Sequence, residues 1–293
     1  MSDAIQRAIL RTLIYADIFS YPLTLAQLHK FLIFNRPVSK KNIKNICQQM
    51  SSVRKEDDFY MLKKSRINIA IRKIKEASSN EKIAFARQLT RIFRIIPWVL
   101  FVGISGAVAA GNARKKDDID FFVIAKRKRL WLTRFFLVIL LQIFGLRRKR
   151  LEKKVMNTIC LNMLLDERCL LLGSKRQDVY TAHEIVQMLP IFDRGDTYSR
   201  FLMANKWVRG YLPNSIDTKI LRYYDIKKKS PNIPIFQYFS IIELIAKQLQ
   251  LWYMRKHRTH EIITDNMLAF HPVDYRKKVL FLYTKRLKQY GIV

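Results

Sequence analysis

The stretch from Val99 to Ala125, VLFVGISGAVAAGNARKKDDIDFFVIA, decides the fold of this chain. Its first apolar residues predict a strand over 99–102, and its last ones predict a second strand over 121–124. Between the two strands, small residues around Gly106 predict a tight turn that leads into a short helix rich in alanine. The stretch therefore predicts an α+β fold in which a glycine turn and a helix join two strands.

Two acidic residues, Asp118 and Asp120, stand at the head of the second strand. Residues two apart on a strand point to the same side, so we expect the two carboxylates to lie next to each other. Adjacent carboxylates repel each other unless a cation lies between them. Asp118 and Asp120 are therefore the expected catalytic residues and metal ligands, holding one or two Mg²⁺ ions against the phosphates of a nucleoside triphosphate.

The glycine turn supplies the second half of a nucleotide site. A strand that runs into a glycine-containing turn and a helix N-terminus exposes backbone N–H groups, which can bind phosphate oxygens without a side chain in the way. Ser105, Gly106 and Ala107 are therefore the residues expected to bind the nucleotide.

This pattern resembles the signature of the nucleotidyltransferase superfamily, which includes DNA polymerase beta and the aminoglycoside nucleotidyltransferases. The likeness consists of Gly106 and Ala107, ten intervening residues, and then Asp118-Ile119-Asp120-Phe121. It implies a central nucleotidyltransferase core over residues 98–180, built as a mixed sheet with helices. It also implies Mg²⁺-dependent transfer of a nucleoside monophosphate from a nucleoside triphosphate to an acceptor.

The chain departs from the superfamily pattern at two places. The residue after the motif glycine is usually Gly or Ser, and here it is Ala107. A third carboxylate usually comes from a later strand, but the strand predicted over 156–165 carries Asn162 and is followed by the first acid, Asp166. Asn162 and Asp166 are the candidate third ligands. These departures favour an alternative, a non-catalytic nucleic-acid-binding regulator with a degenerate nucleotidyltransferase domain.

Residues 1–62 predict three short helices followed by a strand over 57–62. Thr24 and Gln27 form the sequence pattern of a capping box at the start of the second helix, and Ser39 can cap the third. This order of elements resembles winged-helix domains, in which the third helix enters the major groove of DNA. The candidate nucleic-acid contacts on that helix are Lys40, Lys41 and Lys44.

Two further regions flank the predicted core. Residues 63–97 predict a basic pair of connecting helices that ends at Pro97, and residues 181–293 predict a helical C-terminal region. The whole chain resembles a bacterial family of unknown substrate that joins an N-terminal winged-helix-like region to a nucleotidyltransferase domain. Apart from the motif, this resemblance is carried by YADIFSYPLT (15–24), RLWLTR (129–134), CLNMLL (160–165) and LAFHP (268–272).

The charge of the chain is the main departure from an ordinary globular composition. Among 293 residues, Lys and Arg number 55 and Asp and Glu number 23, which leaves a net charge of +32. Such a field concentrates polyanions, whether nucleoside triphosphates, nucleic acid or an anionic membrane surface. A basic proteome with lysines spread over solvated faces would give the same balance. Charge alone therefore predicts a class of partner and no function.

One apolar segment bears on the cellular location. Residues 135–146 carry no charge, but this run is shorter than the roughly 18 residues that a membrane-spanning helix needs, so a buried helix is predicted. The basic run over 147–154 suits peripheral contact with an anionic membrane, a phosphate backbone or water equally well. Three widely spaced cysteines predict a reducing compartment, and we expect a cytoplasmic protein.

Overall fold

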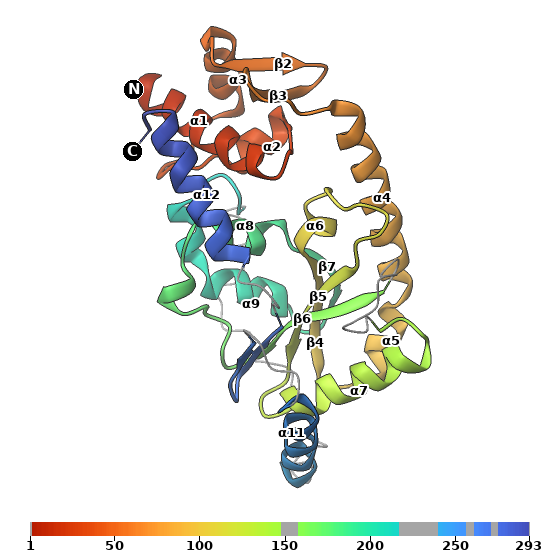
Figure 1. Ribbon diagram of the computed structural model, residues 1–293. Helices are drawn as coiled ribbons and strands as arrows, with labels where there is room; N and C mark the ends of the chain where they lie inside the picture. Colours follow the sequence, from red (N-terminus) through yellow and green to blue (C-terminus); the bar gives the residue numbers. More distant parts are fainter. Residues whose placement is uncertain (1, 148–157, 217–239, 256–260, 271–274, 293) are drawn as a thin grey trace.

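A computed structural model describes residues 2–147, 158–216, 240–255, 261–270 and 275–292 of the chain. The fold is α+β, with a mixed sheet at its centre and helices on both faces, as expected (Figure 1). A smaller sheet and three helices at the N-terminus lie at one end of the molecule, and helix α11 lies at the other end.

The N-terminal region consists of three helices and a three-stranded antiparallel sheet of order β1-β3-β2. Its elements are α1 (Ser2–Ile18), β1 (Leu23–Thr24), α2 (Leu25–Lys30), α3 (Lys40–Gln49), β2 (Val53–Glu56) and β3 (Phe59–Leu62). The predicted capping box is present, since the Gln27 N–H donates to Oγ1 of Thr24 and the Thr24 N–H donates to Oε1 of Gln27. The strand predicted over 57–62 begins only at Phe59, because Asp57 has a φ of +50° and belongs to the turn after β2.

The connector is the predicted pair of helices, α4 (Ile69–Gln88) and α5 (Thr90–Ile95). Its Arg72 is only 1% exposed and joins three parts of the chain. The guanidinium donates to the Tyr21 hydroxyl at 2.7 Å and to the Gly111 carbonyl oxygen at 3.2 Å. Arg72 therefore fixes the N-terminal region against the loop that precedes the two predicted metal ligands.

The central sheet has the order β7-β4-β5-β6-β9-β8. Only β5 and β6 are parallel; the other neighbours are antiparallel. The strands are β4 (Val99–Ser105), β5 (Ile119–Ala125), β6 (Ile159–Asp166), β7 (Leu189–Asp193), β8 (Ile262–Ile263) and β9 (Met267–Ala269), with the short helix α6 (Gly106–Ala109) between β4 and β5. The predicted strand, turn, helix and strand are all present.

Alternate residues of β5 face two separate cores. Phe122 and Ile124 belong to the core shared with the N-terminal region, whereas Phe121 and Val123 belong to a core that includes Phe93 of α5. Asp118 and Asp120 have the same parity as Phe122. Because the side-chain period of a strand is two, both acids are on the side of the sheet that faces the N-terminal region.

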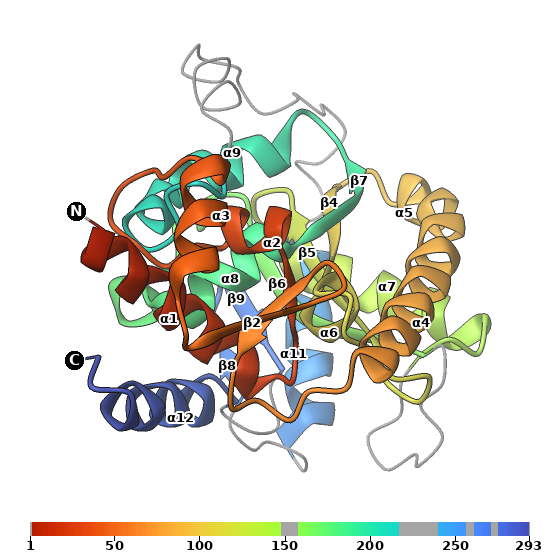
Figure 2. The ribbon, with the colours of Figure 1, turned by 90° about the horizontal axis from the view of Figure 1, so that it is seen from above.

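The C-terminal region was expected to be helical and contains helices, but three of its segments are strands that extend the central sheet. Pro190 lies in β7, an edge strand, where the missing N–H of proline is tolerated. The described helices from residue 174 onward are α8 (Val179–Gln187), α9 (Thr197–Ala204), α11 (Ser240–Arg255) and α12 (Tyr275–Gln289), with short 3₁₀ turns η1 (Ser174–Arg176) and η2 (Lys206–Gly210). Helix α12 packs beside α1, as both views show (Figure 2).

The apolar segment forms α7 (Leu130–Ile143), which is buried on one side only. Leu137 and Leu141 are about 1% exposed, whereas Ile143 is 71% exposed. Among the described residues, no helix combines the length and the apolar character that crossing a bilayer requires. The basic run predicted to contact polyanions lies, apart from Arg147, outside the described residues.

Candidate active site

The two predicted metal ligands come together at one end of the central sheet. Asp118 immediately precedes β5, and Asp120 is paired in register with Cys160 on the parallel strand β6. One ligand atom from each of these three residues lies within 4.8 Å of the other two. The prediction of two neighbouring carboxylates is therefore confirmed, and the three partly buried groups could hold a metal ion.

Gly106 is required beside Asp120 for two reasons. Its φ of +65° lies in the left-handed region, which glycine adopts without strain. A Cβ atom at this position would lie 2.7 Å from Oδ2 of Asp120. On the strand side of the turn, Oγ of Ser105 donates a hydrogen bond to the carbonyl oxygen of Asp120 at 3.4 Å. The predicted turn and the second carboxylate are thus in direct contact.

A cavity of about 610 Å³ opens on these groups, between the N-terminal region and the central sheet. Gly106, Ala107 and Asp120 line it on the side of the sheet, next to Cys160. The wall from α1 and the segment that follows it includes Thr12, Tyr15, Phe19, Tyr21 and Leu23. The N-terminal region is therefore one wall of the candidate active site, which sequence reasoning did not predict.

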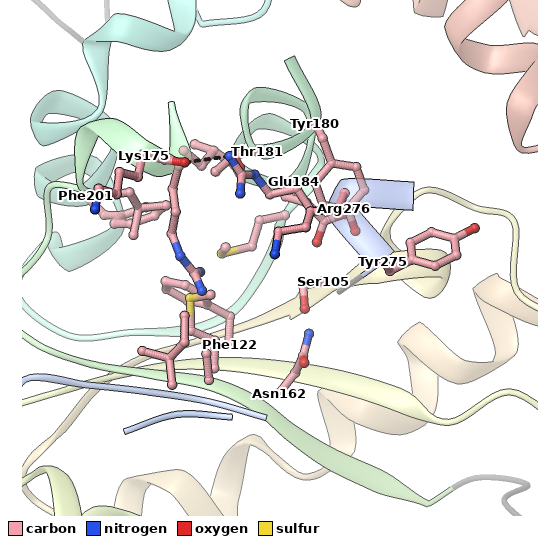
Figure 3. A pocket seen from close by; sticks show the side chains of 18 of the residues that line it. Ser105, Phe122, Asn162, Lys175, Tyr180, Thr181, Glu184, Phe201, Tyr275 and Arg276 are labelled. Carbon is pink, nitrogen blue, oxygen red and sulfur yellow. Dashed lines mark hydrogen bonds between the residues drawn. The ribbon is translucent and has the colours of Figure 1, made fainter. Parts of the chain in front are cut away.

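A second cavity of about 550 Å³ adjoins the first, and Asn162, Tyr180, Glu184 and Tyr275 line both. Figure 3 shows Ser105 and Asn162 on the strands, with residues of α8 above them. The lining of the second cavity combines apolar side chains with four basic ones. The apolar set includes Phe122, Met163, Ile185 and Phe201, and the basic set is Lys175, Arg176, Arg276 and Lys277.

The structure brings one of the two candidate third ligands to this site. Asn162 is 9% exposed and lines both cavities, at a bulge where the pairing of β5 with β6 shifts past it. Asp166 is not brought to the site, since it pairs with Ala125 at the other end of β6. Ala125 lies five positions after Asp120 along β5, which corresponds to a distance of roughly 16 Å. Both Asp166 oxygens accept hydrogen bonds from the Arg168 guanidinium.

Glu184 is the acid that sequence reasoning missed. It lies on α8 and lines both cavities, and burial raises its pKa to about 7. Burial also raises the pKa of the neighbouring Tyr180. The Glu184 carboxylate is the next largest cause of this rise, and Asp120 makes a smaller contribution. The sequence feature that could have identified Glu184 is its place as an acidic residue within the apolar pattern of this helix. Glu184 therefore supplies a carboxyl group that can gain or lose a proton near neutral pH.

The neighbouring His183 has a structural role. Its Nδ1 lies 2.7 Å from the Val179 carbonyl oxygen, and its ring stacks on Tyr15 with centroids 4.1 Å apart. Burial lowers the pKa of His183 to about 4, so the ring is neutral at neutral pH. It joins α8 to α1 and so helps to fix the wall of the first cavity.

Two lysines of the connector lie close to the acids. Lys75 lines the first cavity, and Lys82 is 3% exposed and donates to the Lys115 carbonyl oxygen at 3.0 Å. Burial lowers the pKa of Lys82, while the carboxylates of Asp117 and Asp118 act in the opposite direction. The basic connector therefore contributes positive charge to the site as well as joining two regions.

The predicted nucleic-acid contacts lie elsewhere. Lys40, Lys41 and Lys44 are exposed on α3, and none of them lines either cavity. The apolar side of α3 is buried, with Ile43 fully inaccessible and Ile46 and Cys47 nearly so. A surface that presents these lysines is therefore separate from the candidate active site.

No protein-family model matches the chain, and no curated protein is significantly similar to it. The chemistry of the site therefore rests on its own residues. These are two neighbouring carboxylates and a thiol, an amide at a strand bulge, a buried glutamate, and a glycine turn that faces the same cavity.

Proposed function

We propose that the chain is a Mg²⁺-dependent nucleotidyltransferase, which transfers a nucleoside monophosphate from a nucleoside triphosphate to an acceptor. The observation that carries this proposal is the contact between the carboxylate of Asp120 and the Gly106 turn at the edge of one cavity. A metal site and a phosphate-binding turn then act on the same ligand, as transfer to or from a triphosphate requires.

The arrangement of elements supports this proposal. The order β4, α6, β5, α7, β6 agrees with the strand, glycine turn, helix and strand that resemble the nucleotidyltransferase superfamily. The N-terminal order of helices, with its three-stranded sheet, likewise agrees with the proposed winged-helix-like region. The three cysteines form no disulfide, which suits the proposed cytoplasmic location.

The donor groups fit Mg²⁺ through their oxygen atoms. Magnesium is held by carboxylates, whereas thiolate sulfur favours softer metals such as zinc. Asp118 and Asp120 would therefore hold Mg²⁺, with Cys160 beside them and Asn162 close by. When bound, the ion would offset the negative charge of the triphosphate and of the departing pyrophosphate.

The proposed transfer uses both cavities. The first holds the nucleoside triphosphate, with Lys75 near its phosphates, and the second holds the acceptor. For a hydroxyl acceptor, the oxygen forms a bond to the α-phosphorus while the bond from that phosphorus to the pyrophosphate oxygen breaks. Glu184 accepts the hydroxyl proton, because it lines both cavities and so reaches the junction between donor and acceptor.

The test follows the label of an [α-³²P] nucleoside triphosphate into a mixture of candidate acceptors, with Mg²⁺ and with a chelator. We expect label transfer that requires Mg²⁺ and is lost in Asp118→Ala. The matched control is Cys160→Ser, which changes the third group of the cluster. Because a hard cation depends on oxygen ligands, this control should retain the activity. Transfer that survives Asp118→Ala, or that needs the thiol, would contradict the proposal.

A second candidate function has its own observation in favour, the exposed lysines of α3. In that case the chain binds nucleic acid without catalysis, and its net charge of +32 supports such binding. The triple variant Lys40→Gln, Lys41→Gln, Lys44→Gln would reduce the slope of log affinity against log salt by about three. A slope that the triple variant leaves unchanged would exclude α3 as the contact.

A further inference from the structure

Helix α11 differs from an ordinary surface helix because two of its polar residues, Glu243 and Gln250, make contacts on its inner side. The Glu243 carboxylate accepts hydrogen bonds from the backbone N–H groups of Trp131 and Leu132, at 2.8 and 3.0 Å. Gln250 is 8% exposed and donates to the Trp131 carbonyl oxygen at 2.9 Å. It also accepts a hydrogen bond from Arg134. These contacts attach α11 to the first turn of α7.

Ala246 and Met254 are buried on the inner side of α11, but most of its large apolar residues face outward. Ile241 and Trp252 are each 71% exposed, and they lie three helical turns apart on the same side. The outer face of α11 consists of one polar residue, Gln248, and seven large apolar residues that are each at least 45% exposed: Ile241, Ile242, Leu244, Ile245, Leu249, Trp252 and Tyr253. Figure 1 shows the helix at the end of the molecule opposite the N-terminal region. Soluble proteins rarely leave so many large apolar side chains of one helix in water.

The helix cannot bury this face by turning about its axis. Rotation would separate Glu243 from two backbone N–H groups that begin α7, where no side chain of α7 itself caps the helix. It would also bring the Gln250 amide out of a buried site and break its two hydrogen bonds to α7. Each lost bond to a buried polar group costs about 1–3 kcal/mol. The outward direction of the apolar face is therefore fixed by the polar contacts.

The charge of the chain indicates what covers this face. In the sequence, a run of four Lys and Arg residues, 147–150, comes shortly after α7, and a run with three, 255–258, begins at the last residue of α11. Neighbouring α7 also exposes apolar side chains, among them Phe136, Ile143 and Phe144. A second copy would bring another net charge of +32 to the interface and repel the first, whereas an anionic lipid surface attracts it.

We propose that the outer face of α11 inserts into the interfacial layer of an anionic lipid bilayer, as a peripheral membrane anchor. Apolar side chains enter the boundary between headgroups and acyl chains, Trp252 and Tyr253 lie at headgroup level, and the net charge of +32 attracts the protein to the anionic surface. This inference goes beyond the proposed transferase and does not depend on it.

The test measures binding of the full chain to vesicles by cosedimentation. The vesicles contain either phosphatidylcholine alone or equal parts of phosphatidylglycerol and phosphatidylcholine. The test variant is Ile241→Gln/Trp252→Gln, and the matched control is Ile74→Gln/Phe281→Gln on α4 and α12, where the exposed fractions are 62% and 69%. Circular dichroism and thermal unfolding show whether each variant is folded.

We expect the wild type to bind anionic vesicles and to bind phosphatidylcholine vesicles far less. The test variant should lose about tenfold or more in partition coefficient, and the control variant should stay close to the wild type. Equal binding by the wild type and the test variant would mean attraction by charge alone and would overturn the proposal. So would sedimentation velocity that shows a wild-type dimer and a monomeric test variant, because a second copy would then cover the face.

Discussion

Two acidic ends of the central sheet differ in what surrounds the carboxylates. At one end, Asp118 and Asp120 lie beside Cys160, and Asp120 lines a cavity of about 610 Å³. At the other end, Asp166 is fully buried and its oxygens accept hydrogen bonds from the Arg168 guanidinium and from the N–H groups of Arg168 and Lys128. The strands β5 and β6 contribute to both ends.

The comparison shows that the surroundings of an acid determine its role. A guanidinium and backbone donors satisfy the oxygens of Asp166, so its charge holds the turn after β6 in place. Asp118, Asp120 and Cys160 instead form a cluster that could hold a metal ion beside a cavity. The first end is therefore suited to binding and chemistry, and the second is suited to structure.

The largest expected effect is a loss of transfer activity when an acid at the first end of the sheet is replaced. Asp120→Asn replaces a carboxylate that we propose to bind the metal by a neutral amide, so label transfer from the nucleoside triphosphate should fall by about 1,000-fold or more. Its free energy of unfolding should stay equal to that of the wild type or rise, because neighbouring carboxylates repel each other. Initial rates of transfer and urea unfolding measure the two quantities. The control is Asp57→Asn, an exposed turn residue that pairs with Lys73; an equal loss of rate there would break the comparison.

The next effect concerns Glu184, which lies between the two cavities. Glu184→Gln removes the proposed base, so the rate of transfer should fall by about 100-fold. In the wild type, the rate should decline as the pH falls below about 7, because the carboxyl group takes up a proton there. Rates measured from pH 5.5 to 8.5 check this expectation. A profile that is flat through pH 7 would exclude this role.

The same substitution should stabilise the fold at alkaline pH. Burial raises the pKa of Glu184 in the folded protein to about 7 from an ordinary 4.5. The stability that the protonated side chain contributes is therefore fully present below pH 4.5, and it is lost as the pH rises through 7 and the buried carboxyl group ionises. Glu184→Gln should therefore gain on the order of 1–3 kcal/mol over the wild type at pH 8, and nothing at pH 4. His183 titrates in the opposite sense but is common to both proteins. Urea unfolding at the two pH values measures this difference.

Asp166→Asn should produce the converse result at the structural end of the sheet. Loss of the carboxylate leaves Arg168 without its ion pair and weakens two backbone contacts, at a cost of about 2–3 kcal/mol. The Arg168 side chain is 42% exposed, which limits the cost. Urea unfolding should show this loss, while the transfer rate of the folded protein should equal that of the wild type. A reduced rate would assign Asp166 to the site after all.

The smallest effect isolates the contact between the turn and Asp120. Gly106 and Gly145 both have a φ of +65°, but a Cβ at Gly145 would have no atom within 4 Å. Gly145→Ala therefore costs only the conformational penalty, about 1–2 kcal/mol. Gly106→Ala adds the close approach to Oδ2 of Asp120, so it should cost about 1 kcal/mol more. It should also weaken triphosphate binding, which calorimetry measures. Equal costs and unchanged binding would mean that the turn does not act on the carboxylate.

Local patterns predicted the centre of the molecule. The alternation of apolar residues and the small residues around Gly106 depend on neighbours in sequence, and so does the spacing of Asp118 and Asp120. The strands, the turn and the carboxylate pair were therefore all predicted. The capping box at Thr24 and the two helices of the connector depend on local sequence in the same way.

Tertiary packing determined what the sequence did not reveal. Strands β8 and β9 have only two and three residues, too short for a periodic signal, and β7 contains Pro190. Sequence spacing could not choose between Asn162 and Asp166, because a bulge in β6 shifts the pairing at Asn162. Glu184 reaches the site only because α8 packs between the sheet and α1.

The most direct test of the central claim is calorimetric titration of the chain with each nucleoside triphosphate, with Mg²⁺ and with a chelator, repeated on Asp118→Asn and Asp166→Asn. The account predicts binding that requires Mg²⁺, is lost in Asp118→Asn and is retained in Asp166→Asn. Triphosphate binding that persists in Asp118→Asn with the chelator present would contradict it, because the paired carboxylates would then hold no metal for the nucleotide.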